Sequence, residues 1–129
     1  MILLVDTSSS ECCLYIAHSK DEVKEYRWQS GRELAKGLLS YIERTLEESG
    51  SRIQGLRGIG FYRGPGSFTG LRIGAATCNA VAYSEGIPVV GESGEGWVKD
   101  CINRLESGEN DKVVLPDYGR PARITAPRK

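Results

Sequence analysis

The chain has 129 residues, and its 17 lysines and arginines balance 17 aspartates and glutamates, so net charge gives no argument for a polyanionic partner. This length suits one domain with a core of its own. Four cysteines without a C-x-x-C pair and a single histidine exclude the usual zinc-ligand spacings, so we expect reduced, buried thiols. No apolar run reaches membrane-spanning length and no secretory signal opens the chain, which predicts a cytoplasmic protein without membrane contact.

The first part of the chain predicts three strands and a helix. The apolar run at residues 1–6 suits a strand buried on both faces, residues 12–19 form a second strand, and residues 22–28 alternate as a third strand with one wet face. Leucines and an isoleucine then recur at helical spacing until Gly50 ends the helix. Gly37, inside that helix, indicates either a close packing contact or a tolerated surface glycine.

The second part of the chain predicts further strands and helices in alternation. Residues 58–63 form a fourth strand and residues 87–91 a fifth, while residues 112–116 are compatible with a last strand. Helical patterns cover residues 69–85 and, more briefly, residues 97–106. The longer helix is so poor in charge that we expect it to be covered by the sheet and by either a neighbouring helix or another protein.

The loop FYRGPGSFTGLR at residues 61–72 joins the fourth strand to that helix. Backbone N–H groups at such a junction favour an anion, and Gly64 and Gly66 remove side chains where a phosphate or another backbone comes close. Ser67 and Thr69 would cap the helix or donate to the ligand. The spacing fits neither a Walker loop nor G-x-G-x-x-G, so an anion site and an ordinary capped turn both remain open.

A second candidate anion or nucleotide site follows the first strand. At this end of an α/β sheet, Asp6 would hold magnesium while Thr7 and Ser8 touch phosphate; the alternative is a simple Asx turn. A two-metal nuclease would need a carboxylate at the end of the fourth strand, which ends with Tyr62 and Arg63. His18 falls within the second strand, so no hydrolase base is at hand. We predict no catalytic residue and no resident metal site.

Three segments together resemble the TsaB (YeaZ) family, whose members assist bacterial threonylcarbamoyl-adenosine modification of tRNA. They are ILLVDTSSSECCLYIA, GFYRGPGSFTGLRIG and LPDYGRPARIT. The resemblance covers residues 1 to about 100 and about 113 to 127. It implies an α/β fold of the actin-like (ribonuclease H-like) type: a single lobe with a mixed five-stranded sheet and helices on both faces.

The resemblance also implies a function. Family members are non-catalytic subunits that bind the catalytic homologue TsaD through their first two helices and work with TsaE and TsaC. A metal-binding histidine pair marks TsaD, and this chain has a single histidine. Packing of a TsaD helix pair would cover the charge-poor helix. The predicted interface residues are Leu38, Ile42, Gly70, Gly74 and Cys78.

The chain departs from the family where a second domain is expected. Only a short segment separates the third helix from the tail, so we predict one lobe at residues 1–112 and a basic, proline-containing tail at residues 113–129. We expect that one lobe alone would not bind ATP tightly. ATP and Mg²⁺ would then bind at the interface with a partner. A surface left exposed would favour TsaD or a homodimer, with tRNA contacted indirectly or through the tail.

Two rival functions stay open beside the partner subunit. The first is a minimal actin-like nucleotide-binding or phosphotransfer enzyme that uses Asp6 and the glycine loop. The second is a degenerate domain whose one activity is self-association. The tail has its own alternatives, since it would bind RNA, lie along a partner, or merely keep the chain soluble.

Overall fold

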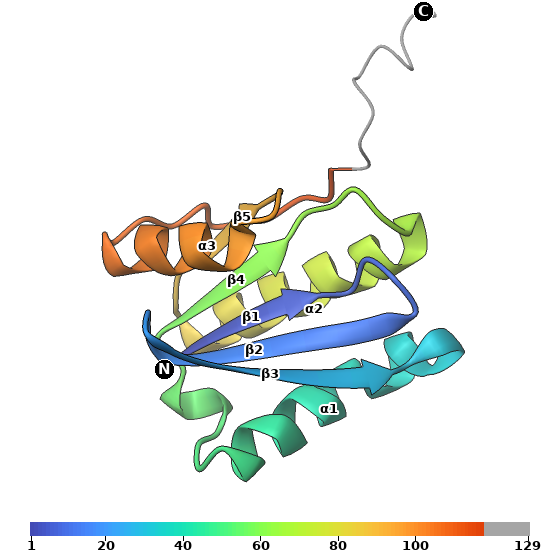
Figure 1. The fold of residues 1–129 in the computed structure, drawn as a ribbon, viewed down its shortest axis with the longest axis horizontal. Coiled ribbons are helices and arrows are strands. Elements are labelled where there is room, and N and C mark those ends of the chain that lie inside the picture. The colour runs from blue at the N-terminus through green and yellow to red at the C-terminus, as the bar shows by residue number, and fades with distance from the viewer. Residues whose placement is uncertain (118–129) are drawn as a thin grey trace, which may run out of the picture.

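The computed structural model describes residues 1–117, which form a five-stranded mixed sheet with helices on both faces (Figure 1). This confirms the predicted fold class and the order of the elements as far as the third helix. The strands are β1 (Ile2–Asp6), β2 (Glu11–Ser19), β3 (Glu22–Gln29), β4 (Gly58–Tyr62) and β5 (Val89–Glu92). The helices are α1 (Leu34–Glu48), α2 (Phe68–Glu85) and α3 (Trp97–Glu106), with short 3-10 turns at Gly31–Glu33 and Ile53–Gly55.

The sheet has the strand order β3-β2-β1-β4-β5. β1 lies at its centre, antiparallel to β2 and parallel to β4. Leu3 and Val5 belong to the core on the side of α1 and α2, whereas Ile2 and Leu4 belong to the core under α3. The continuous apolar run at the start of the chain is therefore a strand buried on both faces, because successive side chains point to opposite sides.

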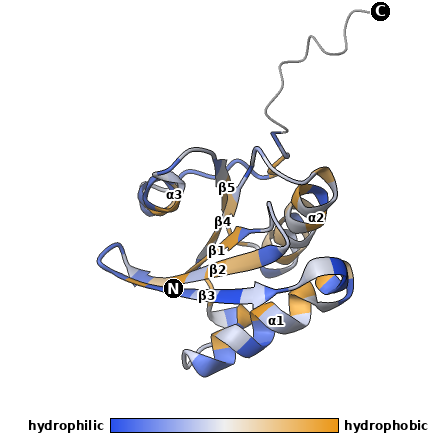
Figure 2. Ribbon diagram, turned by 45° about the vertical axis from the view of Figure 1, so that its right-hand side comes forward, coloured by the Kyte–Doolittle hydropathy of each residue, from blue (hydrophilic) through white to orange (hydrophobic). Residues whose placement is uncertain are grey.

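α1 and α2 lie side by side on one face of the sheet, and α3 covers the other (Figures 1 and 2). Within α1 a Cβ added to Gly37 would lie 2.7 Å from the ring of Trp28. The glycine is thus required for packing, which decides between the two interpretations of that position. None of the helices in the described part of the chain is both long and apolar enough to cross a membrane.

The face that α3 covers is not apolar throughout. α3 lies over β1, β4 and β5, where Trp97 meets Tyr15 edge-on with ring centroids 5.7 Å apart. Further out, on β2 and β3, Arg27 forms ion pairs with Glu11, at 2.8 Å, and with Glu25. These exposed charged side chains make the part of the sheet that α3 does not cover polar.

Residues 107–117, here called the C-terminal strap, cross the outer edge of β5 without forming a strand (Figure 1). Asn110 accepts a hydrogen bond from the amide of Val89 at 3.1 Å, and Asp111 accepts one from the amide of Gly91 at 3.0 Å. The amide of Asp111 donates to the Val89 carbonyl at 2.8 Å. The prediction of a last strand at residues 112–116 is wrong, because Asn110 and Asp111 satisfy the edge of β5 instead.

The strap also packs on the back of α2. Val114 is 2% exposed, and the amide group of Asn79 both donates to and accepts from its backbone, at 3.0 and 2.8 Å. The packed unit therefore extends at least to Asp117, past the boundary predicted after residue 112. Most of the predicted basic tail, residues 118–129, lies outside the described residues.

All four cysteines are free and buried, and the burial agrees with the expectation from the sequence. Burial raises the pKa of Cys12 and of Cys101 to about 12, and it raises the pKa of Cys78 well above its ordinary value. Because the thiolate is the reactive form, these side chains act as small core residues.

Candidate functional site

A hollow of about 430 Å³ lies at the carboxyl end of the parallel strands. Asp6 and Ser8 line it from the turn after β1. One carboxylate oxygen of Asp6 accepts a hydrogen bond from the amide of Ser8 at 2.9 Å, which is the Asx turn foreseen as the alternative. Since Asp6 also reaches the hollow, its role as a magnesium or phosphate ligand stays a prediction, as does that of Ser8. The remaining lining residues are Tyr62, Gly94, Glu95 and Trp97.

Thr7 takes no part in this hollow. Its side chain is fully buried, and its hydroxyl donates to the carbonyl of Gly70 at 2.6 Å. A Cβ at Gly70 or at Gly74 would overlap atoms of Thr7. The predicted phosphate contact of Thr7 is therefore wrong: the residue attaches the start of α2 to the turn after β1, and the two glycines allow that approach.

The glycine loop packs against other segments of the same chain. A Cβ at Gly66 would lie 2.5 Å from Cβ of Ser8, and the amide of Ser67 donates to the Ser8 carbonyl at 2.8 Å. Gly64 has φ +121° and packs against the carbonyl of Asp117 in the strap. At these two glycines the close neighbour is thus another part of the backbone, which was one of the two interpretations of the loop.

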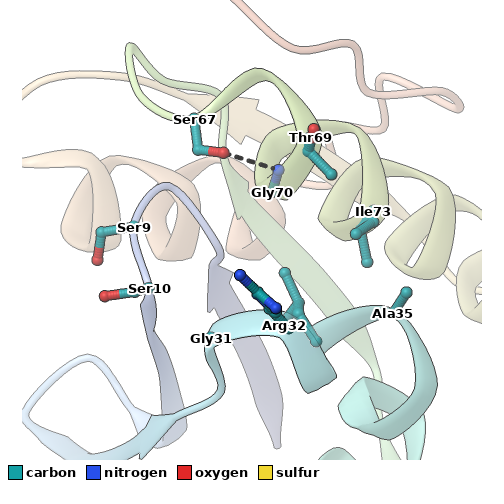
Figure 3. A pocket seen from close by; sticks show the side chains of 10 residues that line it. Ser9, Ser10, Gly31, Arg32, Ala35, Ser67, Thr69, Gly70 and Ile73 are labelled. Atoms are coloured by element: carbon teal, nitrogen blue, oxygen red, sulfur yellow. Dashed lines mark hydrogen bonds between the residues drawn. The ribbon is translucent and has the colours of Figure 1, made fainter.

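The side chain of Ser67 is the N-cap of α2, because its oxygen accepts a hydrogen bond from the amide of Gly70 at 3.1 Å (Figure 3). Thr69 is exposed in the first turn of the helix. The capped-turn interpretation is therefore observed, and an anion bound by Gly64, Gly66, Ser67 and Thr69 remains a prediction.

A groove of about 450 Å³ separates the starts of α1 and α2 (Figure 3). Arg32 and Ala35 line it from the side of α1, and Thr69 and Ile73 from the side of α2. The other lining residues are Ser9, Ser10, Gly31, Leu34, Ser67 and Gly70. This groove belongs to the exposed surface that the two helices form together.

The predicted interface residues do not lie on that surface. All five are buried within the lobe, so a partner cannot contact them while the fold is intact. Those of α1 face the sheet as part of its apolar stripe, and those of α2 face Thr7 and the core. The assignment of Leu38, Ile42, Gly70, Gly74 and Cys78 to a partner interface is wrong.

Their neighbours on the outer side are exposed. Leu39 of α1 is 47% exposed, and Tyr83 of α2 is 91% exposed. Between them α2 presents Arg72, Ala76 and Ala80 to solvent. We call these five residues the helical face.

Sequence reasoning missed residues that line the strand-end hollow and a residue that holds the strap. Glu95 and Trp97 follow β5, and the rule that ligands bind after parallel strands would have pointed to them. The role of Arg63 was missed as well: its Nε donates to the Leu115 carbonyl at 2.9 Å and so holds the strap. In residues 1–117 no group of three or more histidine, cysteine or acidic side chains is placed to hold a metal ion.

The central parallel pair, the antiparallel β2–β3 hairpin and an acid at the end of β1 define a lobe of the actin-like (ribonuclease H-like) class. RuvC from Thermus thermophilus, solved with a Holliday junction substrate, aligns with 95% of this chain and 84% of its own at a TM-score of 0.52. At 9% sequence identity this likeness shows the fold alone.

Sequence comparisons give the family. The family model of TsaD, tRNA N6-adenosine threonylcarbamoyltransferase, matches residues 28–96, about half of the chain. TsaB of Haemophilus influenzae, a tRNA threonylcarbamoyladenosine biosynthesis protein, is 29% identical over 109 residues. YeaZ from Pseudomonas aeruginosa is 30% identical and superimposes with a TM-score of 0.65 over 71% of this chain and 43% of its own. The chain belongs to the TsaB (YeaZ) family.

The match covers only part of each relative's sequence. It takes in 84% of this chain but 46% of the Haemophilus protein. The matched region therefore spans less than half the length of these curated relatives.

Proposed function

We propose that this chain is a non-catalytic subunit that binds a TsaD-type enzyme and supports threonylcarbamoyl-adenosine modification of tRNA. The family membership supports the pathway, since the Haemophilus relative is named for that biosynthesis and the matching family model is that of TsaD itself. TsaC and TsaE are the other expected proteins of the same pathway.

The helical face is the observation that carries this proposal. Leu39 and Tyr83 expose apolar area that association would bury, and aromatic residues of this kind often anchor interfaces. Ala76 and Ala80 are small enough for a partner helix to approach α2 closely. Figure 2 shows the two helices together on one side of the sheet, so a helix pair from a partner can contact both at once.

The strand ends support a non-catalytic role. β4 ends at Tyr62 with Arg63 next, where a metal-dependent nuclease of this fold needs a carboxylate. β2 runs antiparallel to β1, and its Ala17 pairs with Ile2 at the start of β1. His18 therefore lies at the opposite end of the strands from Asp6. The one histidine of the chain therefore cannot act in the strand-end hollow.

Binding to the TsaD protein of the same organism tests the proposal. Replacing Ala76 and Ala80 together by arginine puts two long charged side chains on the helical face, so we expect affinity for TsaD to fall at least about tenfold while the chain stays folded. Lys99→Glu on the exposed side of α3 is the matched control and should leave affinity unchanged. Undiminished binding by the double-arginine variant would place the interface elsewhere.

A modification assay tests the pathway. TsaD, TsaC and TsaE with tRNA, ATP, threonine and bicarbonate should modify tRNA efficiently with this chain present, and poorly without it. Equal rates with and without the chain would remove the supporting role even if the two proteins bind.

A nucleotide-binding function is the second candidate, favoured by the strand-end hollow. Asp6 and Glu95 line it, and carboxylate oxygens are ligands that Mg²⁺ prefers. Titration with ATP and Mg²⁺ should show weak binding by the chain alone and tighter binding with TsaD present, lost in Asp6→Ala. Tight Mg²⁺-dependent binding by the isolated chain would favour the nucleotide-dependent enzyme over the subunit.

A further inference from the structure

The strand-end hollow combines carboxylates with aromatic rings. Asp6 and Glu95 bring two negative charges to it, and Tyr62 and Trp97 line it with rings whose centroids lie 5.5 Å apart. Its lining includes no lysine or arginine, and within residues 1–117 neither carboxylate forms an ion pair. Such a surface suits a guanidinium group, which forms paired hydrogen bonds with carboxylates and stacks on aromatic rings.

The strap ends close to this hollow. The amide of Asp117 donates to the carbonyl of Arg63, the residue after Tyr62, at 2.6 Å. Figure 1 shows the strap reaching the loop that follows β4. Burial, and then the charges of Asp6 and Asp117, raise the pKa of Tyr62, so both carboxylates act on a hydroxyl group at the hollow. The chain therefore leaves the described fold within reach of the hollow.

The sequence that follows carries the complementary charge. Residues 118–129, here called the basic segment, contain no acid and four cations, which are Arg120, Arg123, Arg128 and Lys129. Arg120 follows Asp117 by three residues, which span at most about 10 Å before the side chain is counted. A group tethered this closely has an effective concentration on the order of millimolar, so it competes well with a free cation.

We infer that the strand-end hollow binds the basic segment of its own chain, with the guanidinium of Arg120 held by Asp6 and Glu95. The ring of Tyr62 gives the guanidinium a face on which to stack. Mg²⁺ and a nucleotide would then have to displace this segment before they use the same carboxylates. The inference does not depend on TsaD, and it gives a reason for the weak nucleotide binding expected of the chain alone.

A peptide added to the full-length chain tests this inference. The probe is a fluorescent synthetic peptide with the sequence of residues 118–129. The neutral-tail variant of the chain carries Arg120→Gln, Arg123→Gln, Arg128→Gln and Lys129→Gln, so its own segment no longer competes. Fluorescence anisotropy at low salt should show that the peptide binds the neutral-tail variant at least about tenfold more tightly than the unchanged chain.

Changes in the hollow test the other half of the contact. Asp6→Asn with Glu95→Gln, added to the neutral-tail variant, should weaken peptide binding at least about tenfold, because charge-assisted hydrogen bonds are lost. Glu47→Gln with Glu48→Gln makes the same change in net charge at exposed positions of α1 and is the matched control. We expect that control to bind the peptide like the neutral-tail variant.

Two results would overturn the inference. One is equal affinity of the peptide for the unchanged and neutral-tail chains, and the other is binding that survives the loss of both carboxylates. If circular dichroism shows that Asp6→Asn disturbs the fold, Glu95→Gln alone leaves the Asx turn intact and should still weaken binding about threefold. The assay contains neither TsaD nor nucleotide, so its failure is separate from failure of the proposed function.

Discussion

The two sides of α2 differ in what their small residues do. On the inner side Gly70 and Gly74 are small because Thr7 occupies the space of a side chain, so the helix start is attached to the turn after β1. On the outer side Ala76 and Ala80 face solvent. Small residues thus serve packing within the lobe on one side and leave an open surface on the other. Burial, and not residue size, separates the two roles.

The largest expected effect comes from breaking the inner side. Gly74→Val places a branched side chain onto Thr7 and the ring of Phe61, and overpacking of this kind should lower the free energy of unfolding by about 3 kcal/mol. Ala76→Val on the outer side changes helix propensity alone and should cost about 0.5 kcal/mol. Urea titrations of both variants measure the difference. Similar midpoints would mean that α2 does not pack with Gly74 against β1.

A smaller effect should follow from removing the inner hydrogen bond while keeping the shape. Thr7→Val deletes the buried hydroxyl that donates to Gly70 and so removes one of the hydrogen bonds that this helix carbonyl accepts, at a cost of about 1 kcal/mol. Thr69→Val, at an exposed position of the same helix, is the matched change and should be nearly neutral. Thermal unfolding of the two variants gives the comparison, and an equal loss in both would show that the buried hydrogen bond contributes nothing.

The sequence predicted where helices and strands lie better than it predicted which side of each helix is buried. α1 has one apolar stripe and one charged side, so its buried face could be assigned, although Leu38 and Ile42 were then given to a partner instead of the sheet. In α2 small and apolar residues lie all round the helix, and periodicity cannot say which side faces the core. The glycines at positions 70 and 74 were therefore placed on the wrong side.

The strap shows the other limit of sequence reasoning. Its short apolar run was compatible with a strand, yet Val114 alone is buried while Val113 and Leu115 are exposed. What decides its course is a set of long-range hydrogen bonds, from Asn79 to Val114 and from Arg63 to Leu115. Such pairs join positions more than 30 residues apart, and no local pattern reveals them.

The smallest expected effect concerns pH and the attachment of the strap to β5. Burial pushes the pKa of Asp111 up, but hydrogen bonds from Arg104 and from the Gly91 amide outweigh it and hold that pKa below its ordinary value. A depressed carboxyl pKa gives stability that is fully present above the unfolded value of about 4 and is lost as the pH falls through the folded value.

Thermal stability of the unchanged chain should accordingly decline more between pH 5 and pH 3 than that of Asp111→Asn, by less than about 1 kcal/mol because the ion pair with Arg104 is partly exposed. Glu106→Gln is the matched control, since its carboxylate lies 3.8 Å from Arg57 in a looser pair, and it should follow the unchanged chain more closely. If Asp111→Asn loses stability with acid as steeply as the unchanged chain, the strap is not held to β5 by this charge. The helical face, which contains neither residue, should keep its affinity for TsaD in both variants.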